Sequence, residues 1–162
     1  MWGKKKAVML EAGLRAPSFQ LKSLDGGKKS LEDLLGSGPA LLAFYKASCP
    51  VCQLTFPYLE RLAAGSSLQI IAISQDDDSS TKSFNERCGV TFPTLLDQSK
   101  DGYPASNAYG ISTVPSLFLV EQDAQISKSF SGFSKRDLEA VGERVGVQPF
   151  RPEDNVPDWK AG

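Results

Sequence analysis

Cys49-Pro50-Val51-Cys52 is the stretch that decides the fold of this 162-residue chain, because it joins two runs of different pattern. Residues 40–45 before it read ALLAFY and predict a buried strand, and residues 53–64 after it have the pattern of an amphipathic helix. Two thiols with this spacing on a first helical turn can close a small disulfide ring and open it again with little backbone movement. The stretch therefore favours a redox pair.

The two cysteines are the candidate catalytic residues, and their positions predict different roles. Cys49 is expected at the amino-terminal end of the helix, where unpaired N–H groups and the helix dipole favour a thiolate. Pro50 suits this turn, which does not need the N–H that proline lacks. Cys52 is expected to be buried one turn further in. We therefore expect Cys49 to attack a substrate disulfide and Cys52 to resolve the mixed disulfide.

Two other uses of paired cysteines stay open at this point. A structural disulfide suits small secreted domains, but a chain of this length can bury a core without one, and three cysteines leave one unpaired. A zinc site needs about four ligands, whereas the chain has no histidine and only one further cysteine, Cys88. The sequence thus predicts neither a metal site nor a cofactor. Cys88 is interpreted as a half-buried apolar residue, because nothing near it in sequence would lower its pKa.

Composition limits the classes of partner. The net charge is −1, and the lysine clusters 4–6 and 28–29 are short, so no basic face for nucleic acid is predicted. No apolar run is long enough to span a membrane, and the four apolar residues after Lys6 are too few for a signal peptide. As given, the chain is expected in the cytoplasm, or in the periplasm if a signal or anchor has been removed. A monomer is expected.

The rest of the chain reads as one α/β domain over residues 16–146, with an N-terminal arm over 1–15 and a tail over 147–162 that is laid on the surface or mobile. Strands are predicted at 18–24, 28–30, 40–45, 68–73, 94–96 and 125–130, and within 111–120, where Pro115 opens the strand. Helices are predicted between residues 30 and 36, over 53–64 with the CPVC stretch at its first turn, and at 80–87, 104–109 and 134–145. The first two strands form a hairpin, and those at 40–45 and 68–73 should be parallel neighbours.

Two polar segments of the domain are given plain structural interpretations. The acidic run 76–78 is interpreted as a helix start rather than a cation site. Residues 97–102 are predicted to form a polar loop.

On these motifs the chain resembles the thioredoxin-fold superfamily, in the branch of thiol-disulfide oxidoreductases that share an N-terminal hairpin with the peroxiredoxins of the AhpC/TSA type. Besides the CPVC stretch, Pro57 lies in the helix that follows and is expected to kink it. Val114-Pro115 stands in the place of that fold's cis-proline, and residues 131–135 lead to the last helix as in the family. The resemblance covers roughly residues 16–145.

The resemblance implies a central mixed sheet flanked by helices, with the extra hairpin at the N-terminus. It implies exchange with protein disulfide or dithiol substrates and a separate electron donor, with no cofactor. The implied substrate-binding residues, beside the catalytic pair, are Tyr45, Pro50, Val51, Val114 and Pro115.

The sequence also departs from the family pattern, and one alternative function stays open. Ser48 replaces the tryptophan that commonly precedes the first cysteine, and Ala43 stands in place of a buried acid that relays protons in thioredoxin. The alternative is a peroxiredoxin-like thiol peroxidase, in which Cys52 would be the peroxidatic cysteine. Against it, Tyr45 stands where peroxiredoxins have a proline, and Cys49 replaces their threonine.

Overall fold

The computed structural model describes residues 8–162. The lysine cluster 4–6 of the predicted arm lies outside the described residues. Within them, no helix is long and apolar enough to cross a membrane.

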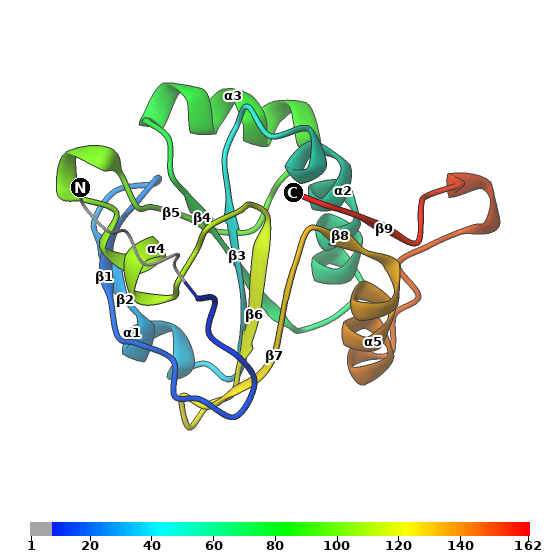
Figure 1. The fold of residues 1–162 in the computed structure, drawn as a ribbon, viewed down its shortest axis with the longest axis horizontal. Coiled ribbons are helices and arrows are strands. Elements are labelled where there is room, and N and C mark those ends of the chain that lie inside the picture. The colour runs from blue at the N-terminus through cyan, green and yellow to red at the C-terminus, as the bar shows by residue number, and fades with distance from the viewer. Residues whose placement is uncertain (1–7) are drawn as a thin grey trace.

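A seven-stranded mixed sheet forms the centre of the molecule (Figure 1). Its strands are β1 (Gln20–Ser23), β2 (Lys28–Ser30), β3 (Ala40–Tyr45), β4 (Gln69–Ser74), β5 (Thr94–Leu96), β6 (Ser116–Val120) and β7 (Ile126–Ser131). They lie in the order β2-β1-β5-β4-β3-β6-β7. The pairs β3–β4 and β4–β5 are parallel, and the other pairs are antiparallel. The predicted mixed sheet, hairpin and parallel neighbours are confirmed.

The central strand β3 is buried along its whole length, as its apolar sequence predicts. Because side chains alternate along a strand, Leu41 and Tyr45 face one hydrophobic cluster while Leu42 and Phe44 face the other. Both faces of the sheet are therefore covered, and β3 carries the chain through the core to the CPVC stretch at its carboxyl end.

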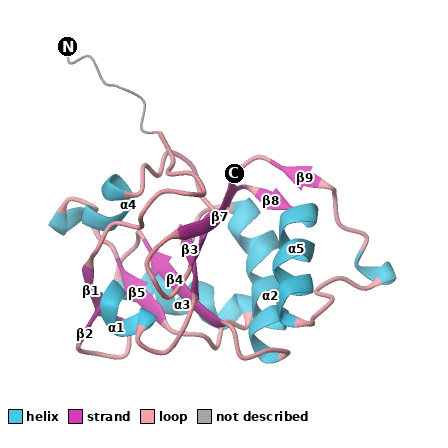
Figure 2. Cartoon of the chain, turned by 90° about the horizontal axis from the view of Figure 1, so that it is seen from below, coloured by secondary structure: helices cyan, strands magenta, loops and turns pink. Residues whose placement is uncertain are grey.

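Five α-helices cover the two faces of the sheet in the described part of the chain. They are α1 (Leu31–Leu35), α2 (Pro50–Ala64), α3 (Asp78–Cys88), α4 (Pro104–Ala108) and α5 (Lys135–Val145). Apolar residues of α2, α3 and α5 join one cluster, and those of α1 and α4 join the other. Figure 2 shows α2 and α5 side by side. The helix that carries the dithiol is therefore packed between the sheet and its neighbours.

The helix starts follow the side-chain chemistry that the sequence predicts. Ser30 and Asp33 form a reciprocal capping box at α1, with N–H to oxygen distances of 3.0 and 2.9 Å. Asp77 accepts the Ser80 N–H at the start of α3. The acidic run is thus a helix start, and among residues 8–162 no three acidic or cysteine side chains gather as metal ligands would.

The segment that leads into β6 agrees with the sequence, whereas the segment after β5 differs from it. Residues 111–115 form a loop with a cis Val114–Pro115 bond, and β6 begins directly after Pro115. Residues 97–102 are not simply a polar loop: the Asp97 side chain is fully buried, and Ser99–Asp101 form a 3-10 turn, η1. The difference arises because Asp97 turns inward to bind the backbone of α4.

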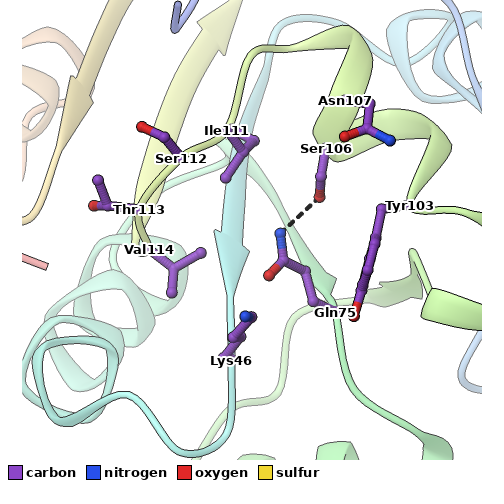
Figure 3. Close-up of a pocket in the computed structure, with 9 residues that line it drawn as sticks. All are labelled: Lys46, Gln75, Tyr103, Ser106, Asn107, Ile111, Ser112, Thr113 and Val114. Carbon is purple, nitrogen blue, oxygen red and sulfur yellow. Dashed lines mark hydrogen bonds between the residues drawn. The ribbon is translucent and has the colours of Figure 1, made fainter. Parts of the chain in front are cut away.

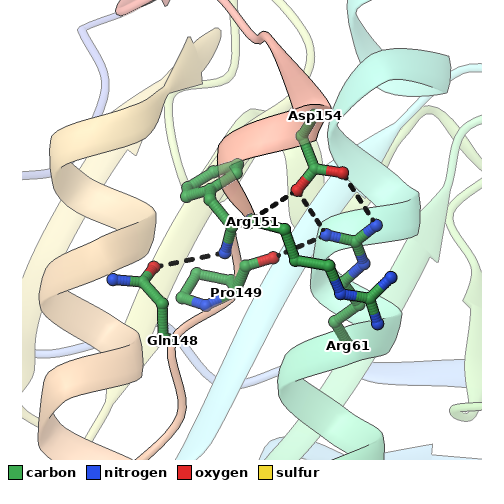
Figure 4. A network of polar contacts seen from close by, with 6 residues as sticks. Arg61, Gln148, Pro149, Arg151 and Asp154 are labelled. Carbon is green, nitrogen blue, oxygen red and sulfur yellow. Dashed lines mark hydrogen bonds and ion pairs between the residues drawn. The ribbon is translucent and has the colours of Figure 1, made fainter.

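The tail follows an ordered path over the surface. After α5 it passes through a 3-10 turn, η2 (Pro152–Asp154), and ends in β9 (Trp159–Lys160), which pairs antiparallel with β8 (Phe133–Ser134). Figure 4 shows how Arg61 of α2 fixes η2: its guanidinium donates to both carboxylate oxygens of Asp154, at 2.7 and 3.0 Å, and to the Pro149 carbonyl at 2.9 Å. The tail is therefore attached to the helix that carries the dithiol.

Candidate active site

Cys49 is the N-cap of α2, and Pro50 occupies the first turn. The Cys49 N–H donates to the Lys46 carbonyl at 3.2 Å, and the Cys52 N–H donates to the Cys49 Sγ at 3.1 Å. The sulfur thus takes the role that a serine or aspartate oxygen has at other helix starts. Cys49 is half-buried and Cys52 is fully buried, as the sequence predicts.

The surroundings of Cys49 lower the pKa of its thiol from 9.0 to about 6. The largest effect is the hydrogen bond from the Cys52 thiol, which lowers the pKa. Burial of Cys49 is the second largest effect, and it raises the pKa. The backbone N–H groups of Cys52 and Val51 and the charge of Lys46 lower the pKa further. At neutral pH Cys49 is therefore mainly a thiolate, the reactive form.

The pKa of the Cys52 thiol is shifted in the opposite direction to that of Cys49. Burial raises its pKa far above the usual range, and the hydrogen bond to the Cys49 sulfur and the negative charge there raise it further. Cys52 therefore stays protonated while Cys49 is charged. All three cysteines are free in this structure.

The cis Val114–Pro115 bond lies against the dithiol although Val114 is 65 residues away from Cys49 in sequence. The Val114 carbonyl accepts from the Cys49 Sγ at 3.3 Å. This contact is available only to the protonated thiol, since a thiolate has no proton to donate. The Val114 carbonyl thus opposes the thiolate. The Cys52 thiol and the N–H groups of Val51 and Cys52 outweigh it, as the lowered pKa of Cys49 shows.

Two of the implied substrate-binding residues lie differently from the expectation. Tyr45 is fully buried, its ring centre lies 4.4 Å from that of Phe56, and its hydroxyl donates to Asn85 at 2.7 Å. Strand alternation turns Tyr45 into the core, so its side chain does not lie on a surface that a substrate could reach. The Val51 side chain is also buried, which leaves its backbone for contact.

The other three implied residues lie around the sulfur at different depths. Pro50 is exposed and Val114 is half-buried, whereas Pro115 is buried. Pro50 and Val114 are therefore the side chains that a substrate could reach.

A polar pocket of about 240 Å³, whose lining Figure 3 shows, opens beside Val114, the residue whose carbonyl contacts the Cys49 sulfur. Its lining residues are Lys46, Gln75, Tyr103, Ser106, Asn107, Ile111, Ser112, Thr113 and Val114. Two of them contact Cys49 directly, Lys46 through its carbonyl and Val114 through its own. Among the described residues of the lining, Lys46 alone is charged. The pocket therefore offers hydrogen-bonding groups and one positive charge next to the reactive sulfur.

Sequence reasoning missed the residue that positions this pocket wall. The buried Asp97 carboxylate accepts the N–H groups of Ala105 and Ser106, at 2.9 and 2.7 Å, and so fixes the start of α4. Ser106 in turn accepts from the Gln75 amide at 2.8 Å across the pocket. The available signal was an acid that follows a buried strand and precedes a short helix, but only the fold brings it to the α4 amides.

Cys88 lies in the last turn of α3, half-buried at the edge of the core. Burial raises the pKa of its thiol, which keeps it protonated and unreactive at neutral pH.

The sequence is similar to those of known thiol-disulfide oxidoreductases, as the paired thiols suggest. Residues 12–129 match the model of the AhpC/TSA family. The chain is 30% identical over 147 residues to the thiol-disulfide oxidoreductase ResA of Geobacillus thermodenitrificans, and the match covers 88% of this chain and 81% of that protein.

Solved structures show the same fold. The thioredoxin domain of a thiol-disulfide oxidoreductase from Bacteroides vulgatus superimposes with a TM-score of 0.73 at 24% identity, covering 83% of this chain and 97% of that one. A secreted disulfide oxidoreductase of Mycobacterium tuberculosis gives a TM-score of 0.65 at 21% identity, covering 78% and 96%.

The fold and the dithiol define the class: this is a thioredoxin-like thiol-disulfide oxidoreductase. The chain belongs to the AhpC/TSA family. The site does not support the alternative in which Cys52 is a peroxidatic cysteine. A peroxidatic cysteine must be an accessible thiolate, whereas Cys52 is buried and protonated.

Proposed function

We propose that this protein exchanges its dithiol with disulfides of protein substrates, with Cys49 attacking and Cys52 resolving. The Cys49 thiolate forms a bond to one substrate sulfur, and the substrate disulfide breaks to release the first thiolate. Cys52 then attacks the Cys49 sulfur as its proton passes to the departing substrate thiolate. The substrate ends as a dithiol and the protein as a disulfide, so a separate dithiol donor must reduce it before the next turnover.

The observation that carries this proposal is the opposed state of the two thiols. The pKa of Cys49 is lowered to about 6 while burial raises that of Cys52. A thiolate that substrate can reach, beside a protonated and buried partner, supports attack by the first and delayed release by the second.

The proposed substrate surface consists of exposed Pro50, the backbone of Val51, and the Val114-Pro115 turn. Its support is proximity: Val51 and Val114 each place a backbone group against the Cys49 sulfur. The pocket next to Val114 would receive a polar side chain that flanks the substrate cysteine.

Turnover of a protein disulfide, such as insulin with dithiothreitol as donor, tests the proposal. The wild-type protein should accelerate reduction. Cys49→Ser should fall to the uncatalysed rate, since Cys52, the other thiol of the site, is buried and protonated. Retention of most activity by Cys49→Ser, with the fold intact by circular dichroism, would contradict it.

We further propose that the exchange takes place outside the cytoplasm, which is one of the two compartments that the sequence leaves open. The support is the structural likeness to a disulfide oxidoreductase described as secreted. Cell fractionation tests this, and recovery of the native protein in the cytosolic fraction would contradict it. We also propose that the protein is a monomer, as the sequence predicts. Light scattering on the purified protein measures its mass in solution and tests this.

A further inference from the structure

The tail segment 158–162 runs beside the dithiol. Its β9 strand pairs with β8, Lys160 opposite Phe133 and Trp159 opposite Ser134. The Lys135 N–H donates to the Asp158 carbonyl at 2.9 Å and extends the pairing. In Figure 1 the tail returns to the end of α2 at which the dithiol lies.

The backbone of the tail lies very close to the backbone of two other segments, and a glycine is present at each of these two contacts. A Cβ atom added to Gly132 would overlap the Lys160 carbonyl oxygen. One added to Gly162 would overlap the Val114 carbonyl oxygen and lie 2.9 Å from the Thr113 hydroxyl. Neither position has room for a side chain without movement of the backbone. The tail is therefore packed between the loop at Gly132 and the loop at Val114.

This position is next to the reactive sulfur. The Val114 carbonyl that Gly162 approaches is the group that contacts the Cys49 Sγ. An extended peptide that added itself as a strand at this edge would need the space that the tail backbone fills. The pocket lies on the α4 side of Val114, and the tail comes from the β8 side.

We propose that residues 158–162 are a specificity-determining segment that occupies the strand position beside Val114. Long extended disulfide substrates are thereby disfavoured relative to substrates that reach Cys49 from the pocket side. The proposal rests on the proposed function. The Arg61–Asp154 ion pair, with its bidentate geometry, holds the segment in place from α2.

Gly162→Ala in the full chain tests this inference, because the added methyl must displace the tail from the Val114 carbonyl. Ala64→Ser is the control, since residue 64 is exposed at the end of α2 opposite the dithiol and lies outside the segment. Both are assayed with two substrates: a pair of ten-residue peptides joined by a central disulfide, and hydroxyethyl disulfide. We expect Gly162→Ala to raise kcat/KM about tenfold for the peptide pair and less than about twofold for the small disulfide. The control should match wild type.

A second variant that lacks residues 159–162 removes the occupant outright and should show the same split between substrates. An equal change for both substrates, or no gain for the peptide pair in either variant, would overturn the inference. Lower activity with the peptide pair would also overturn it, since the tail would then be part of the binding surface. Failure of the proposed function looks different: the wild-type protein would then reduce neither substrate.

Discussion

Cys49 and Cys52 are chemically identical side chains that the fold places in opposite states. The spacing and the helix start predict a thiolate at Cys49 from sequence alone. The size of the effect was not predictable, because its two largest causes, the hydrogen bond from the Cys52 thiol and the burial of Cys49, depend on the folded site. Tyr45 shows the same limit: its place next to the motif suggested a substrate contact, whereas strand alternation buries it.

The lowered pKa of Cys49 predicts a pH profile for its reactivity. In the reduced protein, the rate of alkylation by iodoacetamide should rise as the pH increases through about 6 and level off above it, because the thiolate fraction rises. Mass spectrometry of the alkylated peptide gives the rate at each pH. A midpoint near 9.0, the value of an ordinary thiol, would contradict the assignment.

Cys88 should be dispensable for exchange. Burial keeps its thiol protonated. Cys88 is the last residue of α3, so it lies away from the amino-terminal end of that helix, where a helix dipole would favour a thiolate. Cys88→Ser should leave turnover with insulin within about twofold of wild type, because a thiol that stays protonated takes no part in the exchange. Loss of most activity without loss of the fold would make Cys88 a resolving thiol.

At the scale of elements, the sequence predicts those with strong patterns and misjudges a segment without one. β3 is a continuous apolar run, α2 and α5 begin where the sequence predicts a helix start, and the structure has all three elements. The polar composition of residues 97–102 suggested a loop at the surface. Asp97 is buried instead, and two backbone N–H groups donate hydrogen bonds to its carboxylate. The kink expected at Pro57 stays a prediction.

Asp97 offers a test of how α4 is held against the sheet. Asp97→Ala leaves the N–H groups of Ala105 and Ser106 buried without partners, and should lower the free energy of unfolding by about 2 kcal/mol. Urea denaturation measures this. Asp101→Ala, an exposed acid in the neighbouring turn, is the control and should change stability by less than about 0.5 kcal/mol. Equal effects of the two substitutions would contradict the role of Asp97.

At the scale of the whole molecule, the fold class followed from the order of apolar runs, but the site did not follow completely. The antiparallel pairing of β3 with β6 brings the end of β3 to the start of β6, so the predicted meeting of Cys49 with Val114-Pro115 is confirmed. The tail was expected on the surface or mobile, and nothing in its sequence indicates that β9 pairs with β8 beside the dithiol. That pairing depends on long-range contacts that local patterns do not encode. The division into arm, domain and tail stays a prediction.

Covalent trapping of a substrate by the two single-cysteine variants distinguishes the attacking thiol from the resolving thiol. Each variant is incubated with a peptide disulfide, and the adduct is located by mass spectrometry. We expect Cys52→Ser to accumulate a mixed disulfide at Cys49, because the attacking thiolate is present and the resolving thiol is absent. Cys49→Ser should trap little. Trapping at Cys52 in place of Cys49, or a stable sulfenic acid on Cys52 under peroxide, would contradict it.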